Sequence, residues 1–256
     1  MHPELFKIGP LTVHTYGVLV AAGFLLGVYL AVRQAKKEGI PPNKIVDLGF
    51  YILLSALVGS RLFYVMINAG HYIKNPLDIF KVWEGGLVFY GGILFTVPTV
   101  LWYVKKNALS VWSTADLFAP SLAIGHAIGR IGCFYSGCCY GKPADGLPWA
   151  VTFTDPQCLA LIGVPLHPTQ LYESIGEFTI FLVLITLRKR KSFNGQLFVT
   201  YVILYSVLRF IVEFFRGDVA RGFFTPQISF SQGVSVLMFL TAVAGFIVLR
   251  RGKPRV

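Results

Sequence analysis

The chain has 256 residues, of which 55% are hydrophobic and only 14% are charged, and its net charge is +11. Soluble domains average about 45–50% apolar and about 25% charged residues, so this composition indicates a membrane protein and argues against a soluble domain. The mean hydropathy of +0.64 agrees with that class. The positive charge would suit nucleic acid only if the basic residues formed a single patch.

Seven apolar runs follow one another along the chain, and each approaches the roughly 20 helical residues that cross about 30 Å of hydrocarbon. The runs lie near Tyr16–Val32, Ile45–Ile67, Leu87–Val104, Ala115–Tyr135, Gln170–Leu187, Gly195–Phe215 and Ile228–Leu249. We therefore predict an all-α membrane protein with seven transmembrane helices. Because a basic cluster follows the first run instead of preceding it, we expect a retained span and no cleavable signal peptide.

Basic residues cluster after alternate runs. They are Arg33, Lys36, Lys37, Lys44, Lys105, Lys106, Arg188, Lys189, Arg190, Lys191, Arg250, Arg251, Lys253 and Arg255. Cytoplasmic loops are rich in Lys and Arg, so the amino terminus is predicted to lie outside and the carboxy terminus in the cytoplasm. These residues are topology signals, which argues against nucleic acid as a partner. We expect a single polytopic domain over residues 1–256, with residues 136–169 forming a small extracytoplasmic cap.

Several ionisable side chains lie inside the predicted spans. They are Arg61, Asp116, His126, Arg130, Glu173, Glu177, Arg209 and Glu213. A charge at the bilayer centre costs about 2.5–3.5 kcal/mol on insertion scales, so such residues usually face a bundle interior or a wet cavity. Most of them fall in the predicted outer half, and Asp116 is the clear exception.

Charges gathered in one leaflet indicate a lipid headgroup as the ligand, because an ion path would distribute them through the whole membrane. Arginine offers a fork of donors that matches phosphate oxygens. Arg130 is the strongest candidate, since it has His126 but no acid at helical spacing. A purely structural ion pair is the alternative, above all for Arg209 with Glu213 at i, i+4.

Five motifs together are similar to those of the prolipoprotein diacylglyceryl transferase family. They are HTYGVLVAAGF (His14 to Phe24), WEGGLVFYGG (Trp83 to Gly92), GRIGCFYSGCCYGKPAD (Gly129 to Asp145), HPTQLYES (His167 to Ser174) and LRFIVEFFRG (Leu208 to Gly217). The resemblance follows the same order along nearly the whole chain.

This resemblance implies a multi-pass enzyme of the bacterial cytoplasmic (inner) membrane, with its active site towards the extracytoplasmic leaflet. Such an enzyme transfers the diacylglyceryl group of phosphatidylglycerol to the lipobox cysteine of a preprolipoprotein, forming a thioether and releasing glycerol 1-phosphate. Its expected partners are therefore phosphatidylglycerol, the lipobox segment and membrane lipids. We expect no cofactor and no metal.

The family motifs and the charges inside the spans together give the predicted site. The predicted catalytic residues are Arg130, Arg216, Tyr90 and His167. The predicted substrate-binding residues are Tyr16, Arg61, Gly91, Gly92, Gln170, Tyr172, Glu173, Arg209 and Glu213. Arg130 and Arg216 would stabilise the charge of the departing phosphate.

Two blocks depart from the family pattern. Tyr90 stands where many members carry the histidine of FHGG, and a tyrosine with a pKa of about 10 is a poor base at neutral pH. The proton acceptor could instead be His167, His126 or Glu173. The other alternative is that the reaction needs no protein base. In the second block, Cys133 and Cys138 replace the amide and carboxylate of the usual GNF-x-x-GE.

These departures leave other functions open. A diverged paralogue would bind anionic lipid or modify another acceptor. A membrane transporter is less favoured, because only Asp47 and Asp116 suggest polar groups in the cytoplasmic half.

Four cysteines lie at or beyond the outer end of the fourth run: Cys133, Cys138, Cys139 and Cys158. In an oxidising compartment Cys158 could form a disulfide with Cys138 or Cys139. Unpaired packing thiols are the main alternative. The spacing C-x4-CC is not a usual zinc pattern, so a metal site is less favoured than either. A nucleophilic role is the least favoured, because the thiol of the expected reaction belongs to the substrate.

Overall fold

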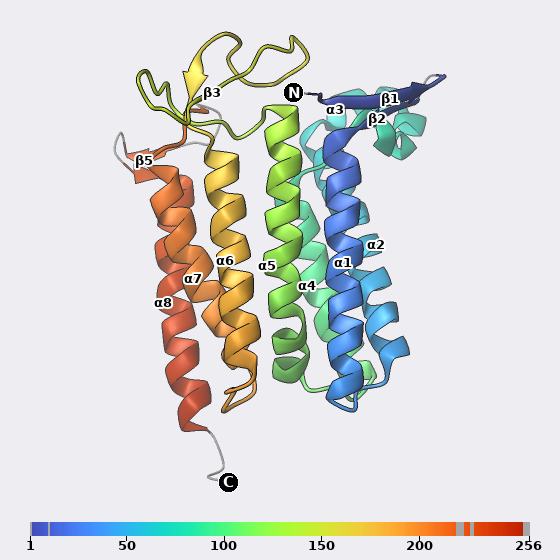
Figure 1. The fold of residues 1–256 in the computed structure, drawn as a ribbon. Helices are drawn as coiled ribbons and strands as arrows, with labels where there is room; N and C mark the ends of the chain where they lie inside the picture. Colours follow the sequence, from blue (N-terminus) through green and yellow to red (C-terminus); the bar gives the residue numbers. More distant parts are fainter. Residues whose placement is uncertain (1, 10, 219–222, 226–227, 253–256) are drawn as a thin grey trace. The chain divides into compact units, whose positions relative to one another are not determined.

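The computed structural model describes residues 2–9, 11–218, 223–225 and 228–252, and its long elements are helices (Figure 1). The long helices are α1 (Thr15–Lys37), α2 (Pro42–Ile67), α4 (Phe89–Lys106), α5 (Val111–Ser136), α6 (Thr169–Arg188), α7 (Gln196–Glu213) and α8 (Phe230–Arg251). Each apolar run of the sequence therefore forms a helix, as predicted.

Six of these helices are long and apolar enough to cross a membrane, namely α1, α2, α5, α6, α7 and α8. α4 has 18 residues, contains Pro98 and ends in Lys105 and Lys106, so its apolar stretch is shorter. The chain is thus a multi-pass helical membrane protein.

The shorter elements lie between or before the long helices. The strands β1 (Glu4–Ile8) and β2 (Leu11–His14) form an antiparallel hairpin, β3 (Val151–Thr152) pairs with β4 (Pro165–Leu166), and β5 (Phe223–Thr225) pairs with β6 (Ile228–Ser229). The remaining pieces are α3 (Ala69–Lys74), η1 (Pro76–Phe80) and η2 (Val82–Glu84). None of these elements was predicted, because short strands and turns lack the apolar period that marks a span.

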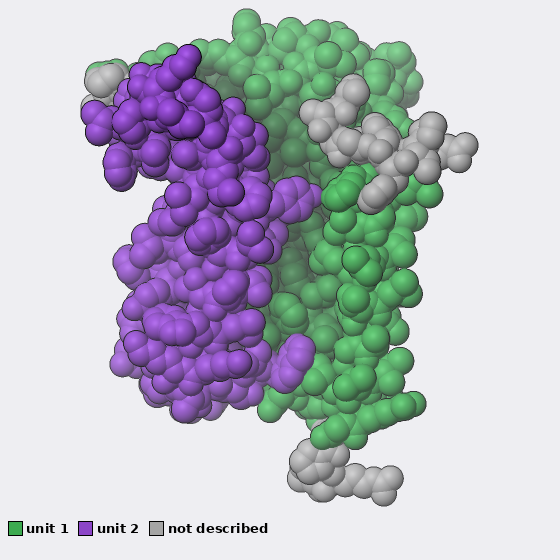
Figure 2. Space-filling model, turned by 180° about the vertical axis from the view of Figure 1, so that it is seen from behind, with its two compact units in different colours: residues 1–30, 115–256 green, residues 31–114 purple. Residues whose placement is uncertain are grey.

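The chain divides into two compact units, coloured green and purple in Figure 2. The first unit comprises residues 1–30 and 115–256, and the second comprises residues 31–114. The prediction of one membrane domain with a cap over residues 136–169 remains a prediction.

In the second unit, α2 packs against α4 through glycines. A Cβ atom placed on Gly91 would lie 2.5 Å from the carbonyl oxygen of Gly59, and one placed on Gly92 would lie 2.7 Å from Ser60 Oγ. Small residues allow two membrane helices to approach this closely. Gly91 and Gly92 therefore have a packing role whatever their relation to substrate.

Arg61, in the same unit, binds backbone carbonyls. Its Nε donates to the carbonyl oxygen of Ile79 at 2.8 Å, and its Nη1 donates to those of Gly85 at 2.8 Å and Gly86 at 3.2 Å. Its Nη2 donates to the carbonyls of Asp78 and Lys81. These five bonds fasten the segment between α3 and α4 and account for the buried charge of Arg61 without a substrate.

In the first unit, α5, α6 and α7 share a core. Its fully or nearly fully buried side chains are Ala119, Ala123, Ile180, Leu184 and Leu197. α1 approaches α5 closely, because a Cβ atom on Gly23 would lie 2.9 Å from the carbonyl oxygen of Gly125. Ser174 Oγ of α6 donates to the carbonyl oxygen of Ala127 of α5 at 2.9 Å, and this bond fixes the two helices beside the candidate site.

Asp116, the one charge expected away from the outer half, caps a helix. Its Oδ2 accepts a hydrogen bond from the backbone N–H of Gly195 at 2.7 Å, and its Oδ1 accepts one from Phe198 at 2.9 Å. The same carboxylate lies 3.0 Å from Lys191 Nζ. A carboxylate at a helix N-terminus satisfies otherwise unpaired N–H groups, so Asp116 anchors the start of α7.

Candidate active site

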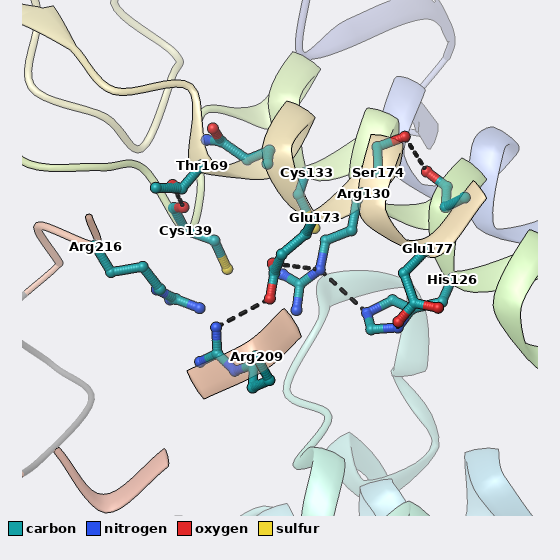
Figure 3. A network of polar contacts seen from close by, with 12 residues as sticks. His126, Arg130, Cys133, Cys139, Thr169, Glu173, Ser174, Glu177, Arg209 and Arg216 are labelled. Carbon is teal, nitrogen blue, oxygen red and sulfur yellow. Dashed lines mark hydrogen bonds and ion pairs between the residues drawn. The ribbon is translucent and has the colours of Figure 1, made fainter. Parts of the chain in front are cut away.

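Glu173 lies at the centre of a cluster of charged residues from three helices (Figure 3). This carboxylate of α6 is 2% exposed. Its Oε2 lies 2.8 Å from Arg130 Nε of α5, and its Oε1 lies 3.0 Å from Arg209 Nη1 of α7. Arg209 also pairs with Glu213 one turn later, at 2.9 Å. The predicted Arg209–Glu213 pair therefore exists, and Glu173 joins it to Arg130.

His126 and Glu177 extend this cluster towards the middle of α5 and α6. Arg130 Nε donates to His126 Nε2 at 3.1 Å, so the ring proton of a neutral His126 belongs on Nδ1. Nδ1 lies 2.7 Å from Glu177 Oε1, and Glu177 is fully buried. The spacings His126–Arg130 and Glu173–Glu177 are each one helical turn, so the two pairs face each other across α5 and α6. Sequence reasoning noted both residues but did not pair them.

Arg130 and Arg216 differ in how the described residues hold them, and Arg216 binds Asp218 through both Nε and Nη2. Within the part of the chain that the structure describes, Nη1 and Nη2 of Arg130 have no hydrogen-bond partner. Arg216 is 6% exposed, and its Nε donates to Asp218 Oδ1 at 2.9 Å. Burial opposes the charge of Arg216, but the bonds to Asp218 outweigh it and raise its pKa above the ordinary value. Both guanidiniums are therefore charged and able to bind an anion.

Three thiols gather beside these arginines. The Sγ atoms of Cys133, Cys138 and Cys139 all lie within 4.8 Å of one another. Cys133 belongs to the last turn of α5, and the other two follow that helix directly. Figure 3 shows Cys139 on the side of Glu173 where Arg216 lies, and Cys133 beside Arg130.

The thiols of the two adjacent cysteines are not equivalent. Hydrogen bonds from Cys133 and Cys138, and then the charges of Arg130 and Arg216, hold the pKa of Cys139 well below its usual range. The pKa of Cys138 is raised, because its hydrogen bonds to the other two thiols and its burial favour the protonated form. The cluster thus favours a thiolate at Cys139.

Cys158 belongs to a different group. It packs with Phe153, Ala160 and Leu166 within the segment between α5 and α6. All four cysteines are free. Cys158 does not belong to the group formed by the other three cysteines. The disulfide from Cys158 to Cys138 or Cys139, which the sequence left open, is therefore not formed in this structure.

The motif that starts α6 supports the cysteine turn. Thr169 Oγ1 donates to the carbonyl oxygen of Cys139, and Gln170 Nε2 donates to that of Cys138, each at 2.7 Å. Gln170 is fully buried, and its Oε1 has no hydrogen-bond partner among the described residues. Part of the predicted substrate-binding motif therefore positions Cys138 and Cys139.

His167 and Tyr172 contact each other beside Arg216. His167 Nδ1 lies 3.1 Å from the hydroxyl oxygen of Tyr172, which also accepts a hydrogen bond from Trp149 Nε1 at 2.9 Å. The His167 ring lies 5.3 Å from that of Phe215, the residue before Arg216. The structure thus brings His167 close to the second predicted phosphate-binding arginine.

Tyr16, in the first turn of α1, lies against the motif of Arg130. A Cβ atom on Gly132 would lie 3.2 Å from Tyr16 Cδ2, so the tyrosine ring covers the glycine that precedes Cys133. Most of the predicted site residues therefore belong to the first unit. They are Tyr16, Arg130, His167, Gln170, Tyr172, Glu173, Arg209, Glu213 and Arg216. Arg61, Tyr90, Gly91 and Gly92 belong to the second unit, where Tyr90 is 61% exposed.

The chain is similar to known proteins over almost its whole length. The family model for prolipoprotein diacylglyceryl transferase matches residues 3–248. A phosphatidylglycerol–prolipoprotein diacylglyceryl transferase of Finegoldia magna is 40% identical over 239 residues, which cover 93% of this chain and 92% of that protein.

Two further relatives carry the same name. The protein of Bacillus licheniformis is 36% identical over 259 residues, covering 100% of this chain and 94% of its own. The protein of Clostridium tetani is 36% identical over 253 residues, covering 99% of this chain and 100% of its own. The predicted resemblance is confirmed.

Proposed function

This chain belongs to the prolipoprotein diacylglyceryl transferase family, and we infer from that membership that it transfers a diacylglyceryl group from phosphatidylglycerol to a prolipoprotein during lipoprotein maturation. The match over residues 3–248 carries this conclusion. We propose further that the acceptor is the thiol of the lipobox cysteine, that the product is a thioether and that glycerol 1-phosphate is released.

We propose that α4 is a seventh crossing, with the amino terminus outside and the carboxy terminus in the cytoplasm of the bacterial inner membrane. Basic residues in the last turns of α1, α4, α6 and α8 support this orientation. Under it, the end of α5 and the start of α6 lie on the extracytoplasmic side, where lipid and prolipoprotein meet. The cap over residues 136–169 then covers the same side.

Arg130 and Arg216 are proposed to hold the phosphodiester. The terminal nitrogens of Arg130, which have no hydrogen-bond partner among the described residues, and the charge of the buried Arg216 support this role. When the bond to the diacylglyceryl carbon breaks, a second negative charge develops on the phosphate. Fixed donors that meet this charge in a site with little water stabilise the transition state more than the bound lipid.

The surrounding network is proposed to position Arg130. Glu173 pairs with Nε of Arg130 and also with Arg209 of α7. His126 accepts a hydrogen bond from the same Nε and is itself paired with Glu177. With Nε fixed, the two terminal nitrogens point in one direction. Arg209, Glu213 and Glu173 therefore act on substrate binding through Arg130.

The remaining predicted residues are proposed to contact substrate. Tyr16 and Tyr172 present aromatic rings, His167 approaches the phosphate through its place beside Arg216, and Gln170 offers an unused buried oxygen. In the second unit, Tyr90 is exposed. Tyr90 then orients substrate instead of taking its proton.

A direct assay tests the function. The purified chain is mixed with phosphatidylglycerol and a lipobox peptide, and the peptide mass and released glycerol phosphate are followed together. We expect a diacylglyceryl adduct and matching glycerol phosphate, and neither product from a peptide with serine in place of the cysteine. Well-folded protein that yields neither product from the cysteine peptide would contradict transfer and favour a diverged paralogue.

A further inference from the structure

The cluster of Cys133, Cys138 and Cys139 has the size of a metal site. Zinc binds thiolate sulfur at about 2.3 Å, so sulfurs around a tetrahedral zinc lie roughly 3.8 Å apart. The three Sγ atoms already lie within 4.8 Å of one another. The largest separation therefore exceeds the tetrahedral spacing by about 1 Å at most.

Backbone contacts hold this cluster in place. The carbonyl groups of Cys138 and Cys139 are fixed by the buried side chains of Gln170 and Thr169. Cys139 has a φ of +60°, in the left-handed region that a residue other than glycine seldom adopts. This residue lies in the turn that keeps the sulfurs of the two adjacent cysteines within 4.8 Å of each other and of Cys133 Sγ. Such strain persists only where the surroundings enforce it, and it is concentrated at functional sites.

The cluster offers three ligands and leaves a fourth position. Within the described residues, no further His, Cys, Asp or Glu belongs to the group. Structural zinc sites have four protein ligands, whereas catalytic sites have three and keep one position for water or substrate. Three thiolates with Zn²⁺ carry one net negative charge, which the neighbouring Arg130 and Arg216 balance.

We propose that Cys133, Cys138 and Cys139 bind a zinc ion whose open position takes the acceptor cysteine of the prolipoprotein as a thiolate. This inference rests on the proposed function, because it needs a thiol as the acceptor. In this proposal the metal activates the acceptor thiol, and no side chain acts as a general base. The poor suitability of Tyr90 as a base then has no consequence for the reaction.

The proposed step is balanced. The acceptor thiol loses its proton to water when its sulfur binds zinc, because a metal-bound thiol is deprotonated. The thiolate attacks the glyceryl carbon that carries the phosphate ester, so a carbon–sulfur bond forms and the carbon–oxygen bond breaks. The electron pair leaves with the phosphate, which departs as the glycerol phosphate dianion beside Arg130 and Arg216. Nothing is oxidised or reduced, and the neutral thioether is a weaker zinc ligand that can leave.

Metal binding is tested first on the purified full chain, kept reduced and supplied with zinc or cobalt(II) alone. We expect roughly one zinc per chain by elemental analysis. With cobalt(II) we expect sulfur-to-metal charge-transfer absorption and the intense visible bands of a four-coordinate ion. Wild-type protein that binds neither ion would overturn the proposal.

Matched cysteine variants locate the site. Cys138→Ser and Cys139→Ser should weaken zinc binding by more than the roughly 10–100-fold that loss of an outer partner of a ligand costs. Cys158→Ser, which lies in the separate Phe153 group, should bind zinc as the wild type does. Elution volume and thermal unfolding check that each variant is folded. Zinc retained by both folded variants would place the metal elsewhere and refute this site.

The acceptor role is tested by adding lipobox peptide to the cobalt protein. A peptide with cysteine should shift the visible and charge-transfer bands, and the serine peptide should leave them unchanged. Identical spectra with both peptides would overturn the role of the substrate as a ligand.

Transfer assays separate this inference from the proposed function. Full transfer by zinc-free protein would refute the metal and leave the function intact. A metal that responds to the cysteine peptide, without either lipid product, would refute transfer and leave the thiol-binding site.

Discussion

At the scale of single residues, the candidate site is a group of buried and partly buried charged side chains. Arg130 is held at Nε by Glu173 and His126, and its other nitrogens have no hydrogen-bond partner in the described part of the chain. A guanidinium fixed in this way can receive a phosphate without reorganising, which is the condition for electrostatic catalysis. Lysine could supply the same charge but not the fork of donors.

Replacement of Arg130 tests this role. Arg130→Ala should lower kcat by roughly 100- to 1,000-fold, the loss found when one donor to a developing charge is removed. Arg130→Lys should recover only part of that loss. The measurement is peptide lipidation by mass, with Arg33→Ala near the end of α1 as the control. Turnover near the wild-type rate in folded Arg130→Ala would remove Arg130 from the mechanism.

Replacement of Tyr90 asks whether its hydroxyl takes the proton. A general base contributes roughly 100- to 10,000-fold, so Tyr90→Phe should keep most of its activity if the thiol is activated elsewhere. The pH profile of kcat/KM should also be unchanged. A loss of about 100-fold or more, with a changed profile, would instead identify Tyr90 as a catalytic acid or base.

At the scale of elements, polar side chains attach helix ends and connecting segments. Asp116 at the start of α5 caps α7, and Arg61 of α2 fastens the segment before α4. Both were singled out in the sequence because they are charges inside apolar runs. Their partners are backbone groups, which a sequence cannot display, so their structural roles became evident only from the fold.

Loss of the Asp116 cap should destabilise the first unit. An Asp-to-Ala change at a helix N-terminus costs about 0.5–2 kcal/mol, and here it also leaves Lys191 without its buried partner. We expect Asp116→Ala to lower the thermal unfolding midpoint in detergent by several degrees. Asp155→Ala, in the segment between α5 and α6, is the control. An unchanged midpoint for Asp116→Ala would show that the two N–H groups are satisfied without the carboxylate.

At the scale of the whole molecule, the alternation of basic loops implies an orientation. Lys74 ends α3 on the predicted outer side, and Arg190 follows α6 on the predicted cytoplasmic side. The positive-inside rule predicts that only the first is reached from outside an intact cell. The proposal of a lipid site at the outer ends of α5 and α6 depends on this orientation.

Cysteine labelling measures the orientation. In intact cells, a membrane-impermeant maleimide should label Lys74→Cys above the level of the parent protein. Arg190→Cys should react only after the membrane is permeabilised. The reverse pattern would place the charged cluster on the cytoplasmic side and contradict transfer to an exported prolipoprotein.

The sequence by itself determined the membrane class, the positions of the long apolar helices and the family. Apolar runs and family motifs are local patterns that read directly along the chain, so the helices at Thr15–Lys37 through Phe230–Arg251 agree with the predicted runs. The sequence also identified Arg130, Glu173 and Arg209 as charges that need partners.

Only the tertiary structure decided which partners they have. The pairing of His126 with Glu177, the capping of α7 by Asp116 and the gathering of Cys133, Cys138 and Cys139 without Cys158 all depend on how helices pack. Contacts between residues far apart in the sequence follow from the relative rotation and depth of helices. Those quantities are set by packing of the small residues between them, such as Gly23 against Gly125, and no local pattern encodes them.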